Sequence, residues 1–193
     1  MTIRGLRRRV TWIALLAASA LALAACGGAE TPAVESATIT GGGEREVSAE
    51  VMAAAIRQLI TKDHTFGQGA HPFTEYLIQD HVDPSAGAPA DPDAQAPRVL
   101  TDTELAAIEA VVAPFGPHRV VGDADEWRTE DLQPAIEGSA ILGVGEPAID
   151  GDTALVPVSL WCGNVCGTWL SYRLDRVDGV WTVTGTEGPV AVS

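Results

Sequence analysis

The stretch that decides the fold is Thr153–Thr186, which reads TALVPVSLWCGNVCGTWLSYRLDRVDGVWTVTGT. It contains three runs rich in β-branched and aromatic residues, and these runs are separated by Gly163-Asn164-Val165 and by Asp178-Gly179. Asp-Gly is a preferred sequence of two-residue hairpin turns, and short loops that contain glycine join strands in wider hairpins. The stretch therefore predicts a three-stranded antiparallel meander.

The two turns also predict a register for the three strands. A two-residue turn at Asp178-Gly179 sets one pairing, and placing Cys162 opposite Cys166 sets the other. Both pairings bring the same apolar residues to one face, so they are mutually consistent. The predicted pairs are Val177 with Val180, Arg176 with Trp181, Asp175 with Thr182, Leu174 with Val183, Arg173 with Thr184, Val158 with Leu170, Val156 with Tyr172 and Ala154 with Leu174. Pro157 cannot donate a ladder hydrogen bond, so we expect a bulge or a broken bond there.

The sequence before the meander predicts helices and further strands. Ser48–Asp63 carries apolar residues at helical spacing, and Ser48 can cap this helix. A second helix follows the capping-box pattern Thr101-Asp102-Thr103-Glu104 and ends before Pro114. Other strands are predicted at Tyr76–Val82, His118–Val121 and Ser139–Val144. We therefore predict an α+β fold with two N-terminal helices packed on a curved antiparallel sheet of about four to six strands, ending in a C-terminal meander.

The meander also resembles the sheet end of a known family. Its Asp178-Gly179 hairpin and the tryptophan that follows, Trp181, are similar to the last strands of NTF2-like proteins. These are cone-shaped α+β domains, many of which bind small molecules and some of which are enzymes. The resemblance includes no diagnostic motif, so it implies a fold and no site residues.

Residues 1–25 have the three parts of a secretory signal. Met1–Arg9 holds four arginines and no acidic residue, and Val10–Ala25 is apolar apart from one threonine and one serine. This is the order of charged region, apolar region and small-residue cleavage site in exported proteins. The apolar region ends in Leu23-Ala24-Ala25, and together with Cys26 these residues resemble the lipobox of bacterial lipoproteins. The resemblance implies that a diacylglyceryl group is attached to Cys26 and that the signal is cut before it.

This resemblance divides the chain into three parts. Residues 1–25 are the predicted signal peptide, residues 26–46 the lipidated cysteine with a flexible tether, and residues 47–193 a single α+β domain. The two acyl chains of a diacylglyceryl group give stable anchoring, whereas one chain gives only marginal binding. The expected location is the extracytoplasmic face of the cell membrane, with the lipid bilayer as a partner through diacylglyceryl-Cys26.

The charge of the mature chain excludes one class of partner. Four of the 12 Lys and Arg residues lie in the signal, which leaves eight, whereas all 26 Asp and Glu residues follow Cys26. The mature chain therefore carries a net charge of −18. Nucleic-acid binding requires clustered Lys and Arg, so nucleic acid is not an expected partner.

The cysteine count predicts one disulfide. Lipidation uses Cys26, which leaves Cys162 and Cys166 as a pair in an exported protein, where disulfides persist. The register of the meander places the two thiols opposite each other, at a spacing that a disulfide can bridge. Redox activity is the alternative, but the spacing has one residue more than the C-x-x-C motif and lies between strands.

Three histidines suggest a metal site as an alternative function. His64, His71 and His81 lie within a short segment together with Asp63 and Asp80, and zinc sites use histidine and carboxylate ligands. Their spacing matches no standard zinc motif, so they are also compatible with a helix end and a loop. We assign no metal ligand to them, and a metal site in this segment stays open.

Other motifs give no catalytic assignment. Asp123, Asp125 and Glu126 could hold calcium through oxygens, but the EF-hand pattern fails, and a solvated acidic loop is the simpler interpretation. Ser139 does not lie in a nucleophile elbow, and Gly143-Val144-Gly145 is not followed by the helix and lysine of a phosphate-binding loop. The sequence thus assigns no catalytic residue, cofactor-binding residue or metal ligand, and implies no cofactor.

Two functions remain open. The first is a membrane-anchored lipoprotein whose non-catalytic domain binds an unidentified small molecule or envelope protein, and the lipobox and the missing catalytic motif favour it. The second is a small metal-dependent hydrolase that uses the His64–His81 region.

Overall fold

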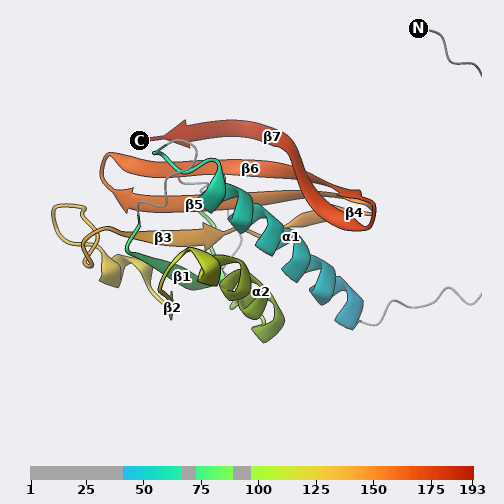
Figure 1. Cartoon of the computed structure of the whole chain (residues 1–193), viewed down its shortest axis with the longest axis horizontal. Helices are drawn as coiled ribbons and strands as arrows, with labels where there is room; N and C mark the ends of the chain where they lie inside the picture. The colour runs from blue at the N-terminus through green and yellow to red at the C-terminus, as the bar shows by residue number, and fades with distance from the viewer. Residues whose placement is uncertain (1–40, 67–72, 89–96) are drawn as a thin grey trace, which may run out of the picture. The chain divides into compact units, whose positions relative to one another are not determined.

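The computed structural model describes residues 41–66, 73–88 and 97–193, so Cys26, the signal peptide and His71 lie outside the described residues. The described chain is an α+β domain with two helices, α1 (Gly41–Thr61) and α2 (Asp102–Val112), and a sheet of seven strands (Figure 1). The strands are β1 (Glu75–Val82), β2 (His118–Val121), β3 (Ser139–Val144), β4 (Ala148–Asp150), β5 (Thr153–Gly163), β6 (Cys166–Val177) and β7 (Val180–Val192). Two short 3-10 helices, η1 (Ala113–Phe115) and η2 (Ala124–Trp127), complete the elements. Neither α1 nor α2 has the length and apolar character needed to span a membrane.

The sheet is mixed, whereas we predicted an antiparallel sheet of about four to six strands. Its order is β2-β1-β3-β5-β6-β7, with β4 paired to β5. β1 runs parallel to both β2 and β3, and the other pairs are antiparallel. The connection from β1 to β2 passes through α2, and a helical crossover returns the chain in the same direction. The prediction was therefore wrong in the direction and the number of the strands.

The predicted register of the meander is confirmed over most of its length. All three predicted pairs of the β5–β6 hairpin form, and so do four of the pairs next to the Asp178-Gly179 turn. Two positions differ, because Arg173 lies opposite Gly185 instead of Thr184, and Cys166 lies opposite Gly163 instead of Cys162. In both cases one strand contains an extra residue, a β-bulge that pairing rules based on turns alone do not reveal.

We predicted a bulge or a broken ladder bond at Pro157; there is no bulge, and the bond that is missing lies on the Gly145 side. The register of β5 and β6 continues through Pro157 and Ser171 without a shift. The Pro157 carbonyl accepts a hydrogen bond of 2.8 Å from the N–H of Gly145. The N and O of one residue point to the same side in an antiparallel ladder, so the missing N–H faces Gly145 and not β6.

Helix α1 begins seven residues before the predicted cap. Ser48 is buried inside the helix, and its hydroxyl donates a hydrogen bond of 2.6 Å to Glu104 of α2. The preceding residues include Glu44, Arg45 and Glu46, which are good or tolerated helix formers, so nothing in them stops the helix before Ser48. Residues 41–46, which we assigned to the tether, are therefore helical. The second predicted cap is confirmed, since Thr101 and Glu104 form a reciprocal capping box.

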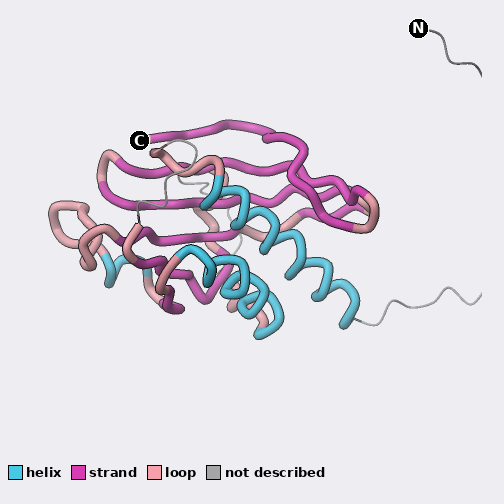
Figure 2. The backbone as a smooth tube through the Cα atoms, in the orientation of Figure 1, coloured by secondary structure: helices cyan, strands magenta, loops and turns pink. Residues whose placement is uncertain are grey.

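Both helices lie on one face of the sheet and enclose the main core (Figures 1 and 2). The core side chains alternate along each strand of the meander, as a sheet with one helix-covered face requires. Largest among the fully buried side chains are Tyr76, Tyr172, Met52, Ile56, Leu59 and Ile60.

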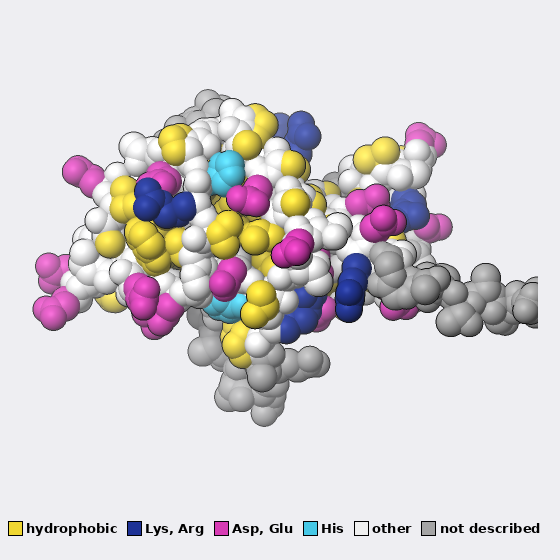
Figure 3. Space-filling model, turned by 90° about the horizontal axis from the view of Figure 1, so that it is seen from below, with side chains coloured by type: hydrophobic (Ala, Val, Ile, Leu, Met, Phe, Trp, Pro, Cys, Tyr) yellow, Lys and Arg dark blue, Asp and Glu magenta, His cyan; other side chains and the backbone are white. Residues whose placement is uncertain are grey.

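The opposite face of the sheet has a smaller core that includes three tryptophans. Trp161 is buried there with Leu77 and Ile141, and Trp127 and Trp169 pack against them. The guanidinium of Arg119 lies 5.4 Å from the ring centre of Trp127, and that of Arg128 lies 4.8 Å from Trp161. Figure 3, which looks at the β2 edge, shows apolar side chains gathered in the left half of the view, with acidic side chains around them.

Candidate functional site

A hollow of about 950 Å³ lies where the start of α1 meets the segment before α2 and the turns around β4. We call it the arginine hollow, and its lining includes Arg45, Ser48, Arg98, Glu146, Ile149 and Arg176. Three of the eight basic residues that follow Cys26 in the sequence therefore line one cavity of an acidic domain. Its volume is in the range of small-molecule sites.

Arg98 holds the inner wall of the arginine hollow through two carboxylates. Its terminal nitrogens donate to both oxygens of Glu104 at 2.9 Å. Its Nε and one terminal nitrogen donate to Glu146 at 2.6 and 3.1 Å. Hydrogen bonds to Glu104 and Glu146 raise the pKa of Arg98 further above its ordinary value. The donors of this guanidinium are therefore used within the protein.

Glu104 is a buried carboxylate, only 1% exposed, that joins both helices. It accepts hydrogen bonds from Arg98, from the Ser48 hydroxyl of α1 and from the Thr101 backbone N–H. Burial by itself would raise the pKa of Glu104, but the hydrogen bonds from Arg98, Ser48 and Thr101 outweigh it and lower the pKa to about 2. The carboxylate is therefore ionised at all physiological pH values.

Arg176 and Arg45 are held differently from Arg98. The closest acidic oxygens to the Arg176 guanidinium lie 3.7 Å away in Glu50 and 4.0 Å away in Asp152, beyond hydrogen-bond length. Its plane lies over the Trp181 ring, with 4.7 Å between the guanidinium carbon and the ring centre. Arg45 is exposed and has no ion-pair partner within the described ranges. These two arginines are thus able to donate to a bound group.

A second hollow of about 540 Å³ lies on the other side of the Arg98–Glu146 pair. Its walls include Ala86, Gly87, Pro157 and Pro189, with Ser171 among the polar groups. Arg98 and Glu146 line both hollows, so this ion pair is the partition between them.

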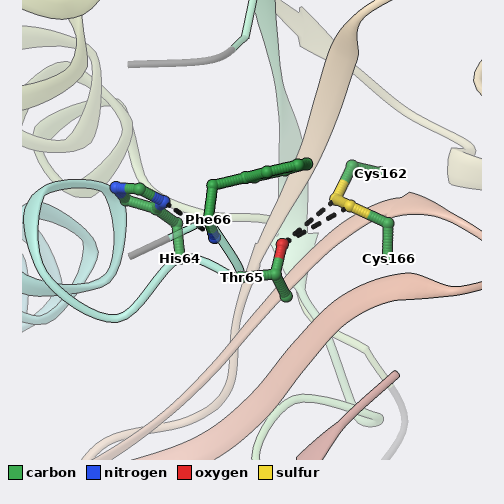
Figure 4. The surroundings of a disulfide bond; sticks show 5 residues. All are labelled: His64, Thr65, Phe66, Cys162 and Cys166. Atoms are coloured by element: carbon green, nitrogen blue, oxygen red, sulfur yellow. Dashed lines mark hydrogen bonds between the residues drawn. A yellow bond between two sulfur atoms is a disulfide. The ribbon is translucent and has the colours of Figure 1, made fainter. Parts of the chain in front are cut away.

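The predicted disulfide between Cys162 and Cys166 is present at the β5–β6 turn, with the Cα atoms 5.0 Å apart (Figure 4). The Thr65 hydroxyl lies 3.5 Å from the sulfur of Cys166 and 3.9 Å from that of Cys162. Phe66, next in the chain, is 56% exposed beside them. The disulfide therefore ties the turn of the meander at the place where the chain leaves α1.

The structure separates two of the three histidines of the proposed metal site. The His64 ring packs 6.4 Å from the Phe73 ring, just before β1, whereas His81 is near the end of β1 and pairs with Asp80 at 3.0 Å. Eight residues of strand span roughly 26 Å, so the two histidines do not share a site. His71 lies outside the described residues. In the ranges that the structure describes, no three His, Cys, Asp or Glu side chains are grouped to hold a metal ion.

The acidic segment Asp123–Gln133 also uses its carboxylates locally. The Asp123 side chain accepts from the N–H of Asp125 and caps η2. The Asp125 carboxylate pairs with Arg128 at 2.8 Å. These contacts favour the interpretation as a solvated acidic loop over a calcium loop.

Two polar contacts, one buried and one partly buried, had no signal in the sequence. Asp63, considered above as a metal ligand, accepts a hydrogen bond of 2.7 Å from the Tyr172 hydroxyl, and burial together with this bond raises the pKa of Tyr172. On the other face, the buried Asp83 accepts from Ser159 at 2.7 Å and from Gln79 at 3.3 Å, directly above Gly143. Both carboxylates connect a loop to the sheet.

The residues of the arginine hollow were also missed, except for the cap of α2. Arg45, Arg98, Glu146 and Arg176 are far apart in the sequence and match no motif. A usable signal was the scarcity of basic residues after Cys26, because a few cations in a chain with 26 Asp and Glu residues are the places where an anion can bind.

Comparisons with known proteins assign no function to the site. No family model matches the chain, and no curated protein or solved structure shows significant similarity to it. The resemblance of the last strands to NTF2-like proteins and that of residues 23–26 to the lipobox therefore stay predictions.

Proposed function

We propose that the protein is a membrane-anchored lipoprotein on the extracytoplasmic face of the membrane, and that its domain binds a ligand in the arginine hollow without catalysing a reaction. The observation that carries the binding role is a cavity of about 950 Å³ with two arginines, Arg45 and Arg176, whose guanidinium groups make no hydrogen bond to other described residues. Anchoring rests on the signal sequence and the lipobox that ends at Cys26.

The position of the hollow supports this combination. The hollow lies at the start of α1, the end of the domain that is nearest to Cys26 along the chain. With a rise of about 1.5 Å per residue, the 21 residues of α1 place the disulfide end roughly 30 Å further away. A ligand in the hollow would therefore lie on the side of the domain from which the anchor leaves.

The ionisable groups in the hollow support binding over proton transfer. A general acid or base works best when its pKa is near the pH of the reaction. The pKa of Glu104 is lowered to about 2 and that of Arg98 is raised, so both charges are fixed near neutral pH. Such groups shape and hold a site, and they do not exchange protons with a substrate.

Anchoring is tested by comparing the wild-type protein with Cys26→Ser in a bacterial host. We expect the wild type to enter the detergent phase with the mass of a diacylglyceryl group on its N-terminal cysteine. Cys26→Ser should lack this mass because a serine hydroxyl does not replace the thiol in lipid transfer. Equal, unmodified masses for both proteins would contradict the anchor.

Binding is tested with probes of different charge on the purified lipoprotein in detergent. Inorganic phosphate, succinate, glucose and putrescine are titrated while the thermal unfolding temperature is measured, and at least one should raise it. Ile149 lines the hollow and is 38% exposed, so Ile149→Trp should fill the space and abolish the effect. Val165→Trp, at the exposed β5–β6 turn, is the matched control and should leave it unchanged. Binding that survives Ile149→Trp, or none of the four probes binding, would contradict the proposal.

A further inference from the structure

We propose that the ligand of the arginine hollow is an oxyanion, a phosphate or carboxylate group, held by Arg176 and Arg45. This inference rests on the proposed function, in which the hollow is the ligand site, and it specifies the chemistry of the ligand. It predicts that an acidic protein binds an acidic group at one defined place.

Two guanidinium groups in the same hollow differ in how they are held. Arg98 makes four hydrogen bonds to carboxylates, between 2.6 and 3.1 Å. The guanidinium of Arg176 makes no hydrogen bond within the described part of the chain, and its two ion pairs are long, at 3.7 and 4.0 Å. A guanidinium has five N–H donors in a fixed fork that matches carboxylate and phosphate oxygens. Arg98 thus has a structural role in the wall of the hollow, whereas the guanidinium of Arg176 can donate hydrogen bonds to a ligand.

The Arg176 guanidinium is held against a tryptophan. Its carbon lies over the Trp181 ring, 4.7 Å from the ring centre, and this cation–π contact holds the group against the protein. Trp181 is only 6% exposed, so the surface beneath the arginine is itself fixed. A stacked guanidinium keeps the donors along its edge available, and it loses less side-chain freedom when an anion binds. The site is therefore prepared for an oxyanion before the oxyanion arrives.

Arg45 lines the same hollow as Arg176. The Arg176 guanidinium lies 3.7 Å from Glu50 of α1, and Arg45 precedes Glu50 by five residues on the same helix. Five residues correspond to about 7.5 Å along the helix axis and to a rotation of about 140° around it, so the shared lining, and not the spacing on the helix, places the two arginines at one space. Both side chains line the same hollow, and Arg45 has no competing ion pair among the described residues. Two separate arginines from two elements therefore face one space.

The charges around the hollow set the sign of the expected effects. Glu146 lines the hollow, but its two oxygens already accept from Arg98. Glu44 also lines the hollow, is exposed, and is next to Arg45, so it opposes an incoming anion. Removing this charge should strengthen anion binding, whereas removing the charge of Arg45 or Arg176 should weaken it.

Two sources can supply such an oxyanion. One is a free metabolite or ion with a phosphate or carboxylate group. The other is the phosphate of a lipid headgroup, because the hollow lies at the end of the domain from which the chain leads to Cys26. The recognition chemistry is the same in both cases, and only an experiment with two arms separates the sources.

The free-anion arm measures binding of inorganic phosphate and of succinate to the full lipoprotein in neutral detergent at low salt by calorimetry. We expect Arg176→Gln and Arg45→Gln each to weaken binding about tenfold or more, the usual cost of losing hydrogen bonds to a charged group. Glu44→Gln should strengthen it about two- to threefold. Arg173→Gln is the control, since this exposed arginine of the same strand lies on the opposite face of the sheet and should have no effect.

The lipid arm uses the same proteins in phosphatidylcholine or phosphatidylglycerol vesicles and follows amide hydrogen exchange of residues 43–48. A lipid source predicts stronger protection in phosphatidylglycerol for the wild type, and loss of that difference in Arg176→Gln and Arg45→Gln. Arginine-dependent binding in either arm supports the inference and identifies the source. No arginine-dependent binding in both arms overturns it. If glucose or putrescine binds and is blocked by Ile149→Trp but not by the arginine variants, the hollow remains the ligand site and the oxyanion assignment is wrong.

Discussion

The two ends of α1 are held by different kinds of contacts. At its start, an ionic network of Ser48, Arg98, Glu104 and Glu146, in which Ser48 and Glu104 are buried, joins four segments and leaves a hollow open beside it. At its other end, the Cys162–Cys166 disulfide closes the β5–β6 turn against Thr65 (Figure 4). The disulfide restrains the chain covalently, and its sulfurs carry no hydrogen-bond donor. At the ionic end, Arg98 is fixed by two carboxylates, whereas the guanidinium groups of Arg45 and Arg176 can still donate hydrogen bonds to a ligand.

The largest effect is expected from breaking the ionic end at its centre. Glu104→Ala removes one of the two carboxylate partners of Arg98 and the acceptor of the Ser48 hydroxyl, and should lower the free energy of unfolding by about 2–4 kcal/mol, because several hydrogen bonds to a buried charge are lost. Glu109→Ala is the matched control on α2, because its ion pair to His118 at 3.7 Å is partly exposed and should contribute about 1 kcal/mol or less. Urea denaturation measures both, and equal losses would show that the network is not the main support of this end.

The second effect is a loss of stability in acid that depends on the same carboxylate. The folded state lowers the pKa of Glu104 from its ordinary value of 4.5 to about 2, so the stabilisation is fully present above pH 4.5. It is lost as the pH falls from 4.5 toward 2, and it amounts to about 3 kcal/mol. Unfolding free energies measured between pH 7 and pH 2 should fall by this much more in the wild type than in Glu104→Gln. Parallel curves for the two proteins would contradict the assignment.

The third effect concerns the covalent end. Replacing both Cys162 and Cys166 by alanine should cost about 2 kcal/mol, because the loop that the disulfide closes is short and restricts the unfolded chain only modestly. We expect the hollow to keep its binding in this variant, since it lies at the opposite end of α1. Thermal unfolding with and without reductant measures the stability change. A loss of ligand binding after reduction would show that the two ends are coupled.

The smallest effect is expected from removing the Thr65 hydroxyl beside the disulfide. Thr65→Val removes a hydroxyl that contacts both sulfurs at 3.5 and 3.9 Å, and sulfur is a weak hydrogen-bond acceptor. The unfolding free energy should change by less than about 1 kcal/mol. A larger loss in urea denaturation would mean that the hydroxyl, and not the covalent bond, positions this turn.

The sequence predicted the parts of the fold that depend on local patterns. The capping box at Thr101, the Asp178-Gly179 hairpin and the disulfide each involve residues that are close along the chain or across one turn, and all three are confirmed. The parallel pairing of β1 with β2 and β3 was missed because it depends on where a helical crossover places the chain.

The contacts of the candidate site also depend on tertiary structure, so local sequence patterns did not predict them. Ser48 has the sequence features of a helix cap, and its role changed because Glu104, 56 residues later, provides a buried partner for its hydroxyl. Arg98 and Arg176 look alike in the sequence, and only the folded chain gives one of them two carboxylates and the other a tryptophan face. Sequence patterns identify which residues are scarce, but the partners of long charged side chains follow from tertiary contacts.

The most direct test of the ligand site follows the arginine side chains themselves. Side-chain Nε–H signals of the wild-type lipoprotein in detergent are recorded by NMR while inorganic phosphate or succinate is added. We predict that the signals of Arg176 and Arg45 shift and saturate together, while those of Arg98, already bound to two carboxylates, and of the distant Arg173 stay in place. Shifts that are uniform over all arginines, or that leave Arg176 and Arg45 unchanged, would contradict an oxyanion site in the arginine hollow.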